Sequence, residues 1–119
     1  MPVKYQGFAI ITLYSETIRY TMIKSFRHKG IKAYFTTGSL AGIQPKHASR
    51  LHVQLTTLNA ATRPEDMNAP GWKLHQLSGS NPKGQTLEGH WAITVSGNWR
   101  LTFYFEGKNA FLIDYQDYH

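Results

Sequence analysis

The last third of the chain alternates apolar and polar residues with a period of two, and two turn sequences interrupt this alternation. Residues 90–96 and 99–105 alternate on either side of a Gly-Asn pair at 97–98, a two-residue hairpin turn in which the glycine supplies a positive φ. A second turn at 107–109 leads to a last predicted strand over residues 110–115. Strands joined by such short turns pair with their neighbours in an antiparallel sheet.

Two more strands are predicted before this meander. One is a short strand over residues 23–26, and the other covers residues 73–77, where polar and apolar residues again alternate. Residues 78–89 are rich in Gly, Ser, Asn and Pro and are expected to form a loop. The histidine that follows this loop, His90, is expected on the surface.

Two helices are predicted between the first strand and the second. The apolar spacing over residues 28–37 favours a helix that Gly38 ends, and Pro45 suits the first turn of a second helix that ends near residue 61. The predicted buried stripe of the second helix is Ala48, Leu51, Leu55 and Leu58, and the residues expected to point outward are Lys46, His47, Arg50, Gln54 and Thr57. The element order predicts an α+β fold, with two helices packed on one face of a twisted antiparallel sheet of about four to five strands.

The chain of 119 residues suits one domain. Residues 1–21 lack this clean patterning and are interpreted as an N-terminal extension that precedes a domain over residues 22–119, although a genuine extra strand is the alternative. The chain has no apolar run of 18 residues and no convincing signal peptide, so a cytoplasmic protein without a membrane segment is expected. It also has no cysteine, which excludes disulfides, thiolate nucleophiles and Cys-ligated metals.

Positive charge is concentrated in the first half of the chain. Thirteen Lys and Arg stand against seven Asp and Glu, and no acidic residue lies between Glu16 and Glu65. Such a balance predicts a partner that carries phosphates or another acidic surface. The histidines at 47 and 52 do not share a helix face as an i,i+4 pair does, so no metal site is expected.

Residues with reactive side chains stand on the predicted polar face of the sheet and at the chain's end. They are His75, Arg100, Tyr104, Asp117, Tyr118 and His119. Arg100 lies between two apolar residues of a strand, and an unpaired guanidinium is costly to bury, so it should meet solvent or an anion on its own face. The alternative is a surface ion pair with Glu106, Asp114 or Asp117.

Several of these segments closely resemble the HigB toxins of the RelE superfamily. The matching runs are MIKSFRHKG (22–30), LNAAT (58–62), KLH (73–75), GNWRLTF (97–103) and DYQDYH (114–119). The resemblance implies a RelE-like fold and a ribosome-dependent endoribonuclease that cuts translated mRNA, inhibits translation and arrests growth. It also implies a HigA-type helix-turn-helix antitoxin as a partner in a hetero-oligomer.

The resemblance also implies which residues form the active site. The family's active-site positions fall on His75, Arg100, Asp117, Tyr118 and His119. The chain differs from the family at Ser78, where a lysine is usual; either Lys73 or Lys83 supplies the missing charge, or cleavage is weakened. RNA carries its own nucleophile, the 2′-hydroxyl, so an acid, a base and a cation suffice for cleavage, and neither a metal nor another cofactor is expected.

Further residues are expected to bind RNA without cutting it. Lys46, Arg50 and Lys73 would contact phosphates, and Tyr104 and Tyr118 would stack on bases or donate to phosphate. Two alternatives remain open. One is a non-cleaving, basic RelE-like module that binds ribosomal RNA or a partner protein, and the other is a nonspecific nucleic-acid-binding protein.

Overall fold

The computed structural model describes residues 22–118. The expected extension over residues 1–21 and the terminal His119 lie outside the described residues. Among the described residues, the helices are too short and too polar to cross a bilayer.

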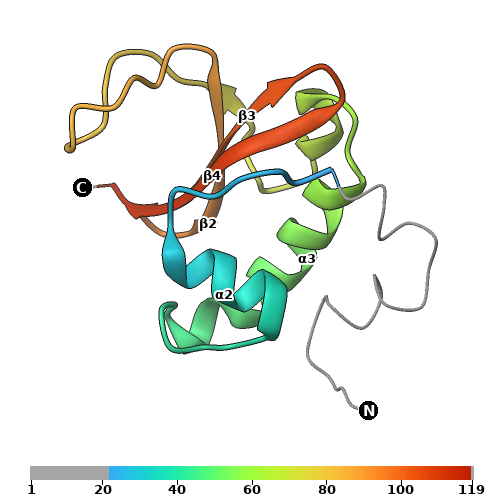
Figure 1. Cartoon of the computed structure of the whole chain (residues 1–119), viewed down its shortest axis with the longest axis vertical. Coiled ribbons are helices and arrows are strands. Elements are labelled where there is room, and N and C mark those ends of the chain that lie inside the picture. The colour runs from blue at the N-terminus through green and yellow to red at the C-terminus, as the bar shows by residue number, and fades with distance from the viewer. Residues whose placement is uncertain (1–21, 119) are drawn as a thin grey trace.

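The sheet is an antiparallel meander of four strands in the order β1-β2-β3-β4 (Figure 1). The strands are β1 (His75–Gln76), β2 (His90–Ser96), β3 (Trp99–Glu106) and β4 (Asn109–Asp117). Gly97 has the predicted positive φ, 55°, in the turn between β2 and β3. The predicted strand over 73–77 is reduced to two residues. Lys73 has a φ of 53°, which extended backbone does not allow, so the strand cannot begin there, whereas the Leu77 N–H still donates to the His90 carbonyl at 2.8 Å.

The predicted first strand is an extended segment rather than a named strand. Residues 22–26 run parallel to β4 through the isolated bridges Ile23 to Ala110 and Phe26 to Ile113. The Lys24 N–H donates to the Ala110 carbonyl at 2.7 Å. The segment therefore covers the open edge of β4.

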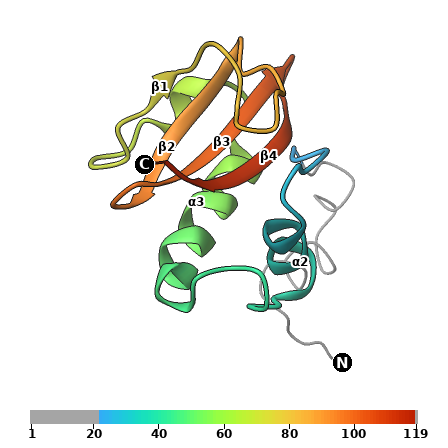
Figure 2. The same cartoon turned by 90° about the vertical axis from the view of Figure 1, so that its left-hand side faces the viewer.

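Both predicted helices are present. Helix α2 (Lys29–Thr37) ends at Gly38, whose φ of 82° makes the left-handed cap that glycine favours. The second predicted helix begins as a 3-10 turn, η3 (Pro45–His47), and continues as α3 (Ala48–Ala60); a further turn, η4 (Pro64–Met67), follows it. Both helices lie on the same side of the sheet, as predicted (Figure 2).

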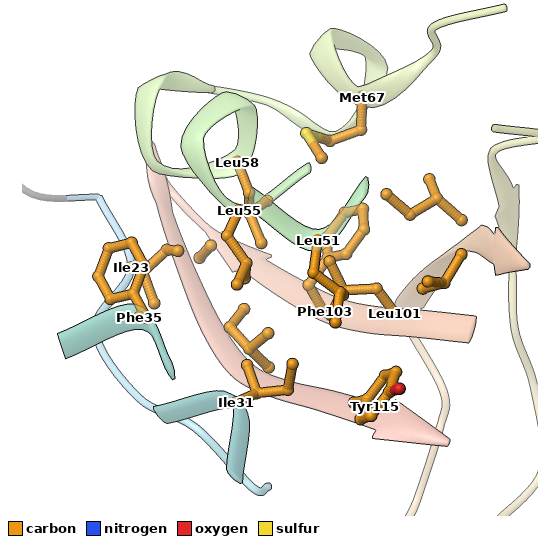
Figure 3. Packing of buried hydrophobic residues seen from close by; sticks show 14 of the residues in the cluster. Ile23, Ile31, Phe35, Leu51, Leu55, Leu58, Met67, Leu101, Phe103 and Tyr115 are labelled. Atoms are coloured by element: carbon orange, nitrogen blue, oxygen red, sulfur yellow. The ribbon is translucent and has the colours of Figure 1, made fainter. Parts of the chain in front are cut away.

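The hydrophobic core fills the space between the helices and the sheet (Figure 3). The predicted stripe of α3 supplies Leu51, Leu55 and Leu58, which are fully buried, and β3 meets it with Leu101 and Phe103. Helix α2 adds its own predicted apolar side chains at 31, 34 and 35. Helical and strand periodicities therefore place the apolar side chains correctly.

Three polar residues contradict the sequence prediction. His47 and Gln54 are buried rather than outward, and His90 is buried rather than on the surface. His47 Nδ1 lies 2.7 Å from the Tyr115 hydroxyl, and the side chain of Gln54 donates to a backbone oxygen of β2. The rings of His90 and Tyr104 pack with centroids 5.3 Å apart. A polar residue that finds a partner in another element can be buried, and periodicity alone does not reveal that partner.

Candidate active site

The sheet register places His75 and Arg100 on one face. His75 pairs with Ala92 on β2, and Arg100 on β3 pairs with Thr94 of the same strand, two residues further along. Residues directly opposite each other in an antiparallel ladder point to the same side, as do residues two apart in a strand. Gln116 of β4 pairs with Arg100 and joins the same face.

The ring of His75 is held in one tautomer. Its Nδ1 lies 2.9 Å from the backbone carbonyl oxygen of Lys73. A carbonyl oxygen only accepts hydrogen bonds, so Nδ1 carries the proton and Nε2 keeps its lone pair. The strained φ of Lys73 directs this carbonyl, and such strain clusters at functional sites. In the neutral ring, Nε2 of the exposed His75 is therefore the nitrogen that accepts hydrogen bonds.

Arg100 is partly buried, and its guanidinium folds back over the β2–β3 turn. Its Nη1 donates to the carbonyl oxygens of Gly97, at 2.6 Å, and Trp99, at 3.2 Å. Within residues 22–118, no ion pair joins Arg100 to Glu106 or Asp114, two of the partners that the alternative interpretation named. One nitrogen is thus anchored, and Nε and Nη2 remain to bind an anion.

A groove lies beside this face, at the end of β4. It holds about 520 Å³ and contains two predicted site residues, Asp117 and Tyr118. The loop over residues 78–89 contributes lining residues, and in Figure 2 the end of β4 lies beside the β2–β3 turn. The remaining lining residues are His28, Ser80, Asn81, Pro82, Lys83, Leu87, Trp99, Tyr115 and Gln116.

Tyr118 directly follows the last residue of β4. Its N–H donates to the Asn98 carbonyl at 2.8 Å, and its Oη is buried with no hydrogen-bond partner among the described residues. Burial raises the pKa of the Tyr118 hydroxyl, Asp114 raises it further, and Arg100 opposes them. The hydroxyl therefore stays protonated at neutral pH and is a hydrogen-bond donor. Asp114 itself is buried and accepts a bond of 2.7 Å from Gln116 Nε2.

His28 is a groove residue that the sequence analysis assigned only to the basic region and the start of α2. Its Nδ1 accepts a hydrogen bond of 3.0 Å from the Ile31 N–H and so caps α2. Burial lowers the pKa of the His28 ring; Asp114 opposes this effect and Lys83 adds to it. The sequence placed residue 28 inside the predicted helix over residues 28–37 and revealed neither its role as the cap nor its contact with a groove built by a distant loop.

The other predicted residues are spread over the surface. Lys73 is exposed beside His75, whereas Lys46 and Arg50 are exposed on the helix layer. Tyr104 is half-buried, packs against His90 and does not line the groove. His119 lies outside the described residues. The structure thus brings Asp117 and Tyr118 together in the groove, with Arg100 close enough to act on the Tyr118 hydroxyl, while His75 stands on the same sheet nearer its edge.

Two comparisons with known proteins agree with each other. Residues 24–119 match the HigB-like toxin family, described as a RelE-like toxin of the type II toxin-antitoxin system HigB. The chain is also similar to a curated protein of Proteus vulgaris named Endoribonuclease HigB, with 40% identity over 98 residues. That alignment covers 82% of this chain and 100% of the relative.

Proposed function

The chain belongs to the HigB-like family of RelE-like toxins of type II toxin–antitoxin systems, and from this premise we propose that it is an endoribonuclease that cuts translated mRNA on the ribosome. The observation that carries the proposal is the match over residues 24–119, which includes every predicted site residue. A toxin of such a system has an antitoxin partner, and we propose that this partner is a HigA-type helix-turn-helix protein.

Cleavage begins with proton removal from the 2′-hydroxyl of the RNA. His75 is suited to this step because its Nδ1–H is bound to the Lys73 carbonyl and its Nε2 is basic. The 2′-oxygen attacks the adjacent phosphorus, the bond to the 5′-oxygen breaks, and a 2′,3′-cyclic phosphate forms. A positioned base of this kind contributes roughly 10²–10⁴-fold to the rate.

The charged phosphorane needs cationic and hydrogen-bonding groups. Arg100 supplies Nε and Nη2, since its Nη1 is already held by the β2–β3 turn. Tyr118 supplies a hydroxyl that stays protonated. His119 is the proposed acid that protonates the leaving 5′-oxygen, and Asp117 orients it. The chemistry needs no metal.

The test uses purified protein, a defined mRNA, and ribosomes programmed with that mRNA. We expect cleavage on programmed ribosomes and none of the same mRNA when it is naked. Equal cleavage of naked mRNA would contradict ribosome dependence, and no cleavage in either sample would contradict the endoribonuclease assignment.

A non-cleaving RelE-like module is the second candidate. It is favoured by Ser78, which stands where the family usually has lysine, and by the net charge of +6. Such a module would bind ribosomes with an affinity that falls steeply with salt and would leave the mRNA intact.

A further inference from the structure

We propose that His28 and Lys83 form a subsite in the groove for a backbone phosphate of the RNA, separate from the phosphate that is cut. This inference rests on the proposed function, because it assigns a second contact to the same RNA substrate. Both residues line the groove, and they come from distant parts of the chain, the start of α2 and the loop over residues 78–89.

His28 contributes a hydrogen-bond donor in a fixed direction. Because Nδ1 accepts from the Ile31 N–H, the proton of the neutral ring lies on Nε2. The edge contact with the Tyr115 ring, with centroids 5.3 Å apart, holds the plane of the imidazole. Burial keeps the ring neutral by lowering its pKa, so the cap and the donor persist together at neutral pH.

Lys83 contributes the positive charge. Hydrogen bonds hold the conformation of its loop. The loop is organised around Asn81, which is buried; Asn81 Oδ1 accepts from the Lys83 N–H at 3.0 Å and from the Gln85 N–H at 2.9 Å. The loop is also tied to the sheet edge, where Arg27 Nη2 donates to the Thr86 carbonyl at 3.5 Å. Lys83 is close enough to His28 for its charge to act on the ring.

The surroundings fit a nucleic acid strand better than a free anion. Trp99 and Tyr115 stack in the groove with ring centroids 4.5 Å apart, and Tyr118 lies beside them. Tyr115 is buried and covers one face of Trp99, so the half-buried rings of Trp99 and Tyr118 are the ones left to contact a base or sugar of a single strand. Asp117 lines the same groove, and its negative charge disfavours a phosphate placed directly against it.

The first experiment compares Lys83→Met and His28→Asn with the wild type in cleavage on programmed ribosomes. Asparagine also caps helices, so His28→Asn keeps the cap of α2 while it removes the Nε2 donor and the ring contact with Tyr115. Loss of a charge-assisted hydrogen bond should raise KM by about tenfold to a hundredfold, with kcat nearly unchanged. A fall in kcat for Lys83→Met would instead assign Lys83 to the phosphate that is cut, as a replacement for the lysine usual at Ser78, and would overturn the separate subsite. Lys83→Arg should restore KM, and the effects of the two substitutions should not add if both groups bind one phosphate.

The control is Lys108→Met, which removes the same charge from the exposed turn between β3 and β4. Its KM should equal that of the wild type. An unchanged KM for Lys83→Met and His28→Asn in an enzyme that cleaves normally would overturn the subsite and leave the proposed function intact.

A binding measurement keeps the inference testable if no cleavage is found. Binding of a short single-stranded RNA is measured at several salt concentrations for the wild type, Lys83→Met and Lys108→Met. Loss of one phosphate contact should lower the slope of log affinity against log salt by about 0.7 for Lys83→Met alone. Equal slopes for the two variants would overturn the subsite whatever the outcome of the cleavage assay.

Discussion

Gln54 lies fully buried in α3 and links this helix to the sheet. Its Nε2 donates to the Thr94 carbonyl at 2.8 Å, across the layer that holds the core. Gln54→Ala removes that bond, leaves the Thr94 carbonyl unpaired and opens a cavity. It also removes Gln54 Oε1, which is buried without a hydrogen-bond partner among the described residues, so the free energy of unfolding should fall by about 1–3 kcal/mol. Denaturant unfolding measures this change. The exposed Thr56→Ala, in the same helix, should stay within about 0.5 kcal/mol of the wild type, and an equally small change for Gln54→Ala would contradict the assignment.

Three histidines make stability depend on pH. Burial lowers the pKa of His28, His47 and His90. A nearby cation adds to this effect at each ring: Lys83 at His28, Lys46 at His47 and Arg27 at His90. Asp114 opposes the effect at His28 and His90. The unfolded chain binds protons at its ordinary histidine pKa of about 6.5, and the folded chain binds them only at lower pH. The stabilisation from these neutral rings is therefore fully present above the unfolded-state pKa. It is lost as the pH falls from that pKa to the lower pKa of the folded state.

Thermal melts between pH 7.5 and 5.5 test this linkage. The melting temperature should fall as the pH is lowered, and His47→Gln, which cannot titrate, should show a weaker dependence than the wild type. A melting temperature that is constant or rises toward pH 5.5 would show that the histidines are not held neutral by the fold.

At the scale of elements, α2 packs against the chain before η3 by direct backbone contact. A Cβ atom at Gly30 would lie 2.5 Å from the Gly42 carbonyl oxygen, a distance that real side chains do not reach. Gly30→Ala must therefore push the helix away from this segment and should cost about 1–3 kcal/mol, or a melting temperature lower by several degrees. Lys32→Ala, at an exposed site of the same helix, is the control; if both variants melt like the wild type, the contact is looser than described.

The elements that form from local sequence are the ones the sequence predicted well. The turn at Gly97 needs a positive φ, and α3 needs an apolar stripe, and both signals lie within a few residues. The shortening of β1 depends on the backbone conformation of Lys73, and the burial of His90 depends on its packing against Tyr104 of the neighbouring strand. The groove was missed for the same reason, because it joins His28 to a loop about fifty residues later in the chain.

For the predicted site residues as well, the sequence predicted some features of their placement and missed others. Register along the strands was enough to place His75 and Arg100 on one face of the sheet, because alternation fixes which side each residue takes. The hydrogen bond that fixes the tautomer of His75 depends on an unusual φ at Lys73, which no pattern of residue types reveals. The fold and the faces could thus be predicted, but not the local geometry that prepares the site.

For the whole molecule, we propose that the basic helix layer is a second surface for RNA. Lys46 and Arg50 are exposed there, in the part of the sequence that lacks acidic residues. Reversal of both charges, Lys46→Glu with Arg50→Glu, should weaken ribosome binding at low salt and flatten its salt dependence. The control is Lys24→Glu with Lys108→Glu, which changes the net charge equally at two other exposed sites. Equal losses for the two double variants would point to net charge rather than to this surface.

We propose that His75, Arg100 and His119 cut RNA and do not hold the fold together. The most direct measurement is the single-turnover rate of mRNA cleavage on programmed ribosomes for the wild type, His75→Ala, Arg100→Ala and a variant lacking His119, each with a thermal melt. We expect melting temperatures within about 2 °C of the wild type and cleavage slower by roughly 10²–10⁴-fold. Variants that melt like the wild type and still cut at its rate would contradict the assignment of the active site.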